Sequence, residues 1–196
     1  MPTFDAATIE RWLAIDPEVL YAPVRAALPK RPARVLDVGA GAGRDAVWML
    51  GQGHDVTCVE PDLDLRAHGQ KLAGAAHWVE TALPDLAGVD GPFDLILISA
   101  VWHLVPDAAR SLSMLRLADL LAQDGRLILS VKNAPDAPCC LEATMIRAAG
   151  LDVVSSQTAP SRQAGNAALG VVWDWSVLRA YAPTERIVNV ALIPPA

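Results

Sequence analysis

The feature that most constrains this fold is a glycine-rich turn between an apolar strand and a helix, VLDVGAGAGRDA over Val35–Ala46. Gly39, Gly41 and Gly43 lack Cβ atoms that would keep a ligand away from the backbone, and they permit positive φ angles. Such a turn predicts a cofactor-binding loop at the start of a helix. Position 44 is Arg, so the spacing is G-x-G-x-G and not the G-x-G-x-x-G of a dinucleotide fingerprint.

An acidic residue follows the next aliphatic run, DVTCVEPD, in which Glu60 comes directly after the apolar residues. A carboxylate at the end of this strand can accept hydrogen bonds from both hydroxyls of a ribose. Glycine turns and acidic strand ends each occur as plain structure. Their order here predicts an adenosine-containing cofactor.

Short aliphatic runs alternate with helical stretches along the chain, which predicts the α/β class. The runs DLILIS and RLILSVK are apolar on both faces, as in the central strands of a parallel sheet with helices on both sides. The predicted strands are Arg34–Val38, Asp55–Glu60, Ala76–Val79, Phe93–Ser99, Arg126–Lys132, Leu151–Ser155 and Val171–Arg179. The predicted helices are Gly43–Gln52, Pro106–Ala122 and one or two between Ala6 and Leu28, split near Pro17.

A chain of 196 residues is the usual size of one domain, so we expect a single domain over residues 1–196. Residues 1–32 form a helical segment that either packs on the sheet or acts as a lid. Residues 33–180 form the cofactor-binding core. Residues 181–196 form a tail whose apolar run, RIVNVALIP, is either an edge strand or a contact in a homodimer.

The charge of the chain bears on its partners and location. Its 16 basic and 22 acidic residues give a net charge of −6, which argues against binding nucleic acid or an anionic membrane. Apolar runs are short, so we expect no membrane span, and the acidic N-terminus argues for the cytoplasm. Cys58, Cys139 and Cys140 form no disulfide framework, and neither they nor the histidines have the spacing of metal ligands.

The ordered motifs resemble those of class I S-adenosylmethionine-dependent methyltransferases, in particular small bacterial ones. VLDVGAGAGRDA is similar to the family's first motif and CVEPD to its acidic second-strand motif. FDLILISAVWHLVP resembles the fourth-strand motif, and QDGRLILSVK the turn into the fifth strand. This resemblance implies a Rossmann-like sheet of seven mostly parallel strands in the order 3-2-1-4-5-7-6, with the seventh antiparallel.

The resemblance also implies roles for individual residues, first of all around the cofactor S-adenosylmethionine. Asp37 would hold the loop or bind the amino group through water, and Arg44 would bind the methionine carboxylate or remain a solvated cation. Glu60 would bind the ribose. The other residues implied at the cofactor are Gly39, Ala40 and Gly41 beneath the methionine, Pro61 and Asp62 beside the adenine, Glu80 at the adenine edge, and Ser99 and Ala100 beside the methyl group.

Trp102 and His103 follow the fourth predicted strand at the edge of the sheet where open α/β folds bind ligands. Both are candidates for substrate contact, and His103 is the candidate general base. The alternative is that the pair caps the strand and packs on the next helix. Trp173 and Trp175 share one face of the last predicted strand and favour a packing role.

The predicted function is methyl transfer to a small-molecule acceptor, because the chain lacks the [Asp/Asn]-Pro-Pro-aromatic run typical of base-methylating enzymes. Two other functions stay open. One is a cofactor-binding protein without turnover, since a fold does not establish chemistry. The other is a nicotinamide-dependent oxidoreductase, which the missing third fingerprint glycine disfavours.

Overall fold

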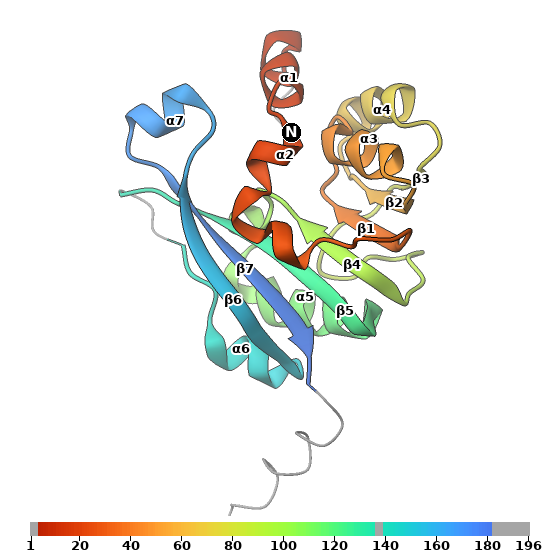
Figure 1. The fold of residues 1–196 in the computed structure, drawn as a ribbon, viewed down its shortest axis with the longest axis vertical. Coiled ribbons are helices and arrows are strands. Elements are labelled where there is room, and N and C mark those ends of the chain that lie inside the picture. Colours follow the sequence, from red (N-terminus) through yellow and green to blue (C-terminus); the bar gives the residue numbers. More distant parts are fainter. Residues whose placement is uncertain (1–3, 136–138, 182–196) are drawn as a thin grey trace, which may run out of the picture.

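A computed structural model describes residues 4–135 and 139–181 of the chain. Its centre is a seven-stranded sheet in the order β3-β2-β1-β4-β5-β7-β6 (Figure 1). The strands are β1 (Arg34–Val38), β2 (Asp55–Val59), β3 (His77–Val79), β4 (Phe93–Ile98), β5 (Leu121–Asn133), β6 (Leu151–Pro160) and β7 (Val172–Ala180). β1 to β5 pair in parallel, and β7 is antiparallel to both β5 and β6. The predicted fold class and strand order are confirmed.

Two strands are longer than predicted, for reasons that lie in their partners. β5 begins at Leu121, because this residue pairs with Phe93 ahead of an irregularity in the register. β6 extends to Pro160, because its pairing with β7 continues as far as Val172. Both extensions depend on pairing between strands, which the composition of a single strand does not reveal. The tail run RIVNVALIP lies outside the described residues.

The helices fall into an N-terminal group and a set of crossovers. The N-terminal group is α1 (Ala6–Leu13), α2 (Pro17–Leu20) and the 3₁₀ helix η1 (Ala22–Ala27). The others are α3 (Arg44–Gly51), α4 (Leu63–Leu72), η2 (Trp102–Leu104), α5 (Asp107–Leu120), α6 (Ala143–Ala148) and α7 (Ala164–Ala168). The aspartates before α1 and α2, Asp5 and Asp16, accept hydrogen bonds from N–H groups of the first turn. The predicted break near Pro17 is confirmed.

The sheet buries both faces, because neighbouring side chains along each strand point to opposite sides. Leu36 and Ile96 pack in a cluster with Met114 and Leu117 of α5. A second cluster on the other face joins other apolar side chains of β1 and β4, among them Val35, to α3 and to the N-terminal segment with η1. In Figure 1 the N-terminal helices lie on the opposite side of the sheet from α5 and α6.

Candidate active site

The backbone of the glycine-rich turn is anchored to the neighbouring strand. The N–H groups of Gly39 and Ala40 both donate to the carbonyl of Val59, at 2.7 and 3.0 Å. Gly39 has φ +73°, and a Cβ atom there would collide with Val101. Gly41 has φ +54°, and a Cβ atom there would meet nothing within 4 Å. The loop is therefore packed against Val101 at Gly39 and has free space beside Gly41.

Glu60 stands immediately after β2, and its carboxylate faces the loop. Oε2 accepts the Gly41 N–H at 2.8 Å, and Oε1 accepts the Asp62 N–H at 2.9 Å. Only 6% of the residue is exposed. Burial raises the pKa of Glu60, while the backbone N–H groups of Asp62 and Gly41 act in the opposite direction. The glycine loop and the acidic strand end, two separate motifs in the sequence, thus meet in one site.

The residues expected beside the adenine have structural partners of their own. Asp62 caps α4 by accepting the N–H groups of Asp64 and Leu65, both at 3.0 Å. Pro61 is exposed next to it. The exposed Glu80 forms an ion pair at 2.6 Å with Arg66, whose buried guanidinium also donates to the carbonyl of Glu60 at 2.7 Å.

Arg66 is a site residue that the sequence analysis missed. Its role depends on a contact with Glu80, fourteen residues further along the chain. No spacing signal marks such a pair. Through Arg66, helix α4 holds the backbone carbonyl of Glu60 in place.

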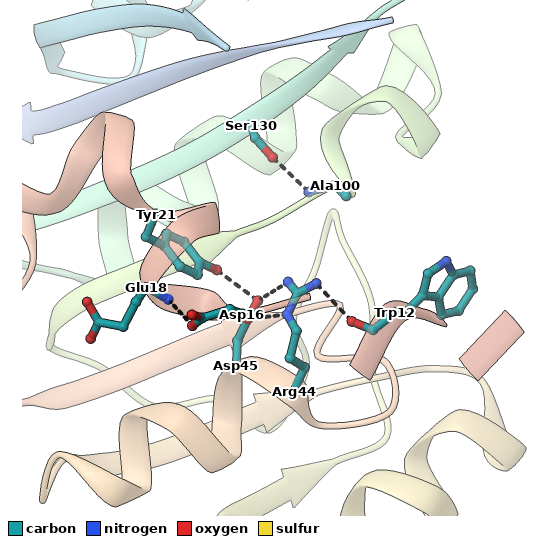
Figure 2. Close-up of polar contacts among 8 residues, drawn as sticks. All are labelled: Trp12, Asp16, Glu18, Tyr21, Arg44, Asp45, Ala100 and Ser130. Atoms are coloured by element: carbon teal, nitrogen blue, oxygen red, sulfur yellow. Dashed lines mark hydrogen bonds and ion pairs between the residues drawn. The ribbon is translucent and has the colours of Figure 1, made fainter. Parts of the chain in front are cut away.

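A buried polar cluster lies beneath the loop (Figure 2). Arg44 forms two bonds with Asp45, Nε to Oδ1 at 2.7 Å and Nη2 to Oδ2 at 2.8 Å. The Tyr21 hydroxyl donates to the same Oδ2 at 2.8 Å. Asp37 is 2% exposed, and its Oδ2 has no hydrogen-bond partner within the described chain. Burial, followed by repulsion from Asp45, raises the pKa of Asp37 well above its usual range.

The charged side chains of Arg44 and Asp45 are both engaged within the protein. Asp45 binds side chains of Arg44 and Tyr21. The Asp45 carboxylate does not cap its own helix, since α3 has no side-chain cap bond. Arg44 is neither solvated nor free, because it also reaches the carbonyl of Trp12 at 3.5 Å.

Tyr21 fixes the N-terminal segment to the sheet. Its ring stacks on Trp48 with centroids 5.2 Å apart and meets Trp175 edge-on at 5.3 Å. Burial, together with the charge of Asp45, raises the pKa of Tyr21, so the hydroxyl remains a donor at neutral pH. The segment packs on the sheet and also lines the pocket described next, through Ile15 and Leu20.

A pocket lies at the carboxyl ends of β4 and β5. Ser99 and Ala100, predicted beside the methyl group, line it together with Arg44, Ser130 and residues of the β6–α7 loop and β7. Ala100 has φ +60°, and its N–H donates to Ser130 Oγ at 2.9 Å. Figure 2 shows this bond across from the Arg44 cluster. Trp173 and Trp175 also line the pocket, and both pack in the core cluster on this face of the sheet, as their shared strand face predicted.

The side chains of Trp102 and His103 lie in different environments. The Trp102 ring is 0% exposed and belongs to the hydrophobic core, which corresponds to the packing alternative and leaves no surface for a substrate. His103 is half-buried, and its ring meets Trp173 edge-on at 5.5 Å. The described lining of the pocket does not include His103. Burial, then Lys132 and Arg110, lowers its pKa, so the imidazole is neutral near pH 7.

Within residues 4–135 and 139–181 no group of three or more His, Cys, Asp or Glu side chains could hold a metal ion. Over the same ranges no helix is long and apolar enough to cross a membrane. Cys58 is buried, Cys139 is half-buried and Cys140 is exposed; all three are free thiols.

A family model described as a methyltransferase domain matches residues 11–179. The chain belongs to this methyltransferase family. The resemblance drawn from the four sequence motifs is therefore confirmed. The match begins within α1, includes the glycine loop and the strands β1 to β6, and ends within β7.

Individual methyltransferases are similar to the chain. A ubiquinone biosynthesis O-methyltransferase of Xylella fastidiosa (strain 9a5c) is 33% identical over 132 residues, 65% of this chain and 51% of that protein. The chain spans about half the length of the curated relatives it matches.

Solved structures of methyltransferases share the fold. The 1,6-didemethyltoxoflavin-N1-methyltransferase of Burkholderia thailandensis, with bound 1,6-didemethyltoxoflavin and S-adenosylhomocysteine, has a TM-score of 0.61 and 28% identity, covering 84% of this chain and 76% of that one. A TehB-like SAM-dependent methyltransferase of Corynebacterium glutamicum has a TM-score of 0.69 and 20% identity, covering 89% and 97%. The second likeness concerns the fold alone.

Proposed function

We propose that the chain is an S-adenosylmethionine-dependent methyltransferase that acts on a small-molecule acceptor. The observation that carries this proposal is the bond between the Gly41 N–H and the Glu60 carboxylate, at the open side of the glycine loop. The Burkholderia structure, in which a methyltransferase holds S-adenosylhomocysteine and a small heterocycle, supports both parts of the proposal.

The residues present fit this cofactor. Glu60 has backbone N–H groups on both oxygens, which fix the carboxylate at a position where it can accept ribose hydroxyls. Asp37 offers a buried oxygen without a partner, suited to an ammonium group. The open front of Gly41 leaves room for the methionine part. When bound, S-adenosylmethionine supplies an electrophilic methyl group on a sulfonium.

Positioning by the pocket accounts for most of the chemistry that the chain has to perform. Ser99 and Ser130 would hold an acceptor with its lone pair directed at the methyl group that the bound cofactor would supply, with the sulfonium sulfur as leaving group and any proton of the acceptor atom released to solvent. Alignment of the acceptor atom, the methyl carbon and the sulfur in a pocket lined in part by the apolar Ile15 and Leu20 lowers the barrier without an obligatory base.

His103 enters the proposal as a positioning residue, since its ring supports the pocket wall at Trp173. A general base at His103 would require the ring to reach the acceptor. The pH dependence of kcat distinguishes these roles. If His103 is a general base, kcat falls at low pH as the imidazole is protonated, and this fall is absent in His103→Gln. If His103 is a positioning residue, His103→Gln changes KM and leaves the pH dependence of kcat the same.

Calorimetry with S-adenosylmethionine and S-adenosylhomocysteine tests the cofactor assignment. Glu60→Gln should weaken binding at least about tenfold, because a neutral amide accepts ribose hydroxyls less strongly. Asp55→Asn is the matched control: it neutralises an exposed carboxylate at the far end of the same strand and should leave binding unchanged. Failure of the wild type to bind either compound at millimolar concentration would refute the proposal.

Turnover separates the enzyme from its alternatives. A screen of small acceptors with detection of S-adenosylhomocysteine should find methyl transfer. Cofactor binding without turnover on any acceptor would favour a non-catalytic binding protein. Binding of a nicotinamide nucleotide in place of the methionine nucleotide would favour an oxidoreductase. A cytoplasmic location and a homodimer are further parts of the proposal, the latter open to light scattering in solution.

A further inference from the structure

The unpaired charge in the described lining of the pocket is positive, although the chain as a whole is acidic. The chain carries a net charge of −6, yet the described lining contains two arginines and no carboxylate. Arg44 is committed to Asp45 by two short bonds. Arg162, in the loop between β6 and α7, has no hydrogen bond or ion pair with any residue of the described ranges.

The carboxylate nearest in sequence to the pocket tryptophans does not offset Arg162. Asp174 lies between Trp173 and Trp175 on β7, so its side chain points to the opposite face from theirs. Its Oδ2 accepts from Asn133 Nδ2 at 3.0 Å, and its Oδ1 accepts from Thr158 Oγ1 at 2.6 Å. Both oxygens are satisfied there, which leaves the positive charge of Arg162 for a ligand.

Two further cationic side chains lie near Trp173, outside the lining of the pocket. Lys132 and Arg110 act on His103, and the ring of His103 packs against Trp173. Arg110 is paired with the exposed Asp107 at 2.8 Å, so Lys132 contributes the larger unshared charge. An anion in front of Trp173 therefore faces positive charge from the loop and from the wall.

The neutral groups of the pocket are hydrogen-bond donors beside flat aromatic surfaces. Ser130 Oγ accepts from the Ala100 N–H and Ser161 Oγ from the Gln163 N–H at 3.3 Å, so each hydroxyl proton remains to be donated. Trp173 is half-buried and gives the pocket a rigid indole wall, whereas Trp175 is 2% exposed and offers little surface to a ligand. A wall of this kind favours a planar ligand.

We propose that the methyl acceptor is a small planar anion, an aromatic or heteroaromatic compound with a carboxylate or ionised hydroxyl, and that Arg162 binds its negative group. The inference rests on the proposed function and adds the chemical class of the acceptor. Arg162 is a substrate-binding residue in this assignment, placed at the exposed rim of the pocket. Its guanidinium is suited to a carboxylate, which it can bind through two parallel N–H donors.

The experiment uses matched probes in the presence of saturating S-adenosylhomocysteine. The probes are hydroxybenzoates and pyridine carboxylates, each paired with the carboxamide of the same ring, and binding is measured by calorimetry. The wild type should bind each carboxylate about tenfold more tightly than its carboxamide, a preference that weakens with salt. Arg162→Gln should remove the preference by weakening the carboxylate alone, and Arg162→Lys should restore part of it.

A control variant and three outcomes decide the inference. Arg147→Gln removes an exposed arginine on α6, outside the pocket lining, and should change nothing. Equal binding of carboxylate and carboxamide by the wild type, or equal weakening of both by Arg162→Gln, would overturn the anion assignment. Binding of neither probe would also overturn it. S-adenosylhomocysteine binding is recorded in every case, so its loss identifies failure of the proposed function instead.

Discussion

Tyr21→Phe removes a single oxygen atom from the contact that fastens the N-terminal segment to the sheet. The lost bond, Tyr21 Oη to Asp45 Oδ2 at 2.8 Å, is buried and has a charged acceptor. Hydrogen bonds to charged groups contribute about 1.5–3 kcal/mol to stability. Arg44 keeps both of its bonds to the carboxylate, so we expect the lower part of that range, about 1.5–2 kcal/mol. The ring contacts with Trp48 and Trp175 remain.

Thermal unfolding followed by circular dichroism measures the loss. For a chain of this size about 1 kcal/mol corresponds to 2–4 °C, so the midpoint should fall by about 3–8 °C. The effect should be the same from pH 6 to pH 8, because the raised pKa of Tyr21 keeps its hydroxyl protonated throughout.

Tyr181→Phe is the matched control for Tyr21→Phe. Tyr181 is half-buried, and its hydroxyl has no hydrogen bond with the described residues. We expect this change to cost less than about 0.5 kcal/mol. If Tyr21→Phe lowered the midpoint no further than Tyr181→Phe, the bond to Asp45 would not be what fastens the segment.

Three further predictions concern the glycine loop and the buried titratable groups. Gly39→Ala should destabilise the protein more than Gly41→Ala: both residues have positive φ, but only a Cβ atom at position 39 would collide with Val101. Gly41→Ala should instead weaken S-adenosylmethionine binding. Thermal unfolding measures the loss of stability, and calorimetry measures the loss of binding. Asp37 has a folded-state pKa above its ordinary value of 3.8, so the folded state keeps the proton longer and the free energy of unfolding falls as pH rises through that interval. Urea unfolding across this range should show the fall in the wild type and not in Asp37→Asn, which should be the more stable protein at neutral pH and the weaker cofactor binder. His103 has a folded-state pKa below 6.5, so the unfolded state gains a proton first as pH falls, and stability is lost from about pH 6.5 downward. His103→Gln should lose less stability over the same pH interval. Identical curves of unfolding free energy against pH for the two proteins would contradict the lowered pKa.

The parts of the site that could be predicted are those with a local signature. Gly39, Gly41 and Glu60 follow strands that are visible as aliphatic runs, and their meeting follows from parallel strands ending at one edge of a sheet. The strand order came from the resemblance to a family, because hydrophobic periodicity identifies strands without ordering them. The extra length of β5 and β6 was missed since it depends on partner strands.

Side-chain partnerships across the fold could not be predicted in this way. Tyr21 and Asp45 are 24 residues apart, and nothing in the residues around Tyr21 distinguishes it from a surface aromatic. Trp102 illustrates the reverse case. Its position after a central strand suggested a ligand contact, yet the first residue of the short helix η2 turns its ring into the core.

The contacts of Tyr21 with Trp48 and Trp175 have a consequence for altering the acceptor range of this chain. Trp175 lines the pocket and also packs against Tyr21, so a smaller residue at position 175 would enlarge the pocket and weaken the packing of Tyr21. Ile15 and Leu20 line the same pocket without forming either aromatic contact. New acceptor shapes are therefore more readily accommodated by single changes at Ile15 or Leu20, whereas changes at Trp175 call for a compensating substitution at Tyr21.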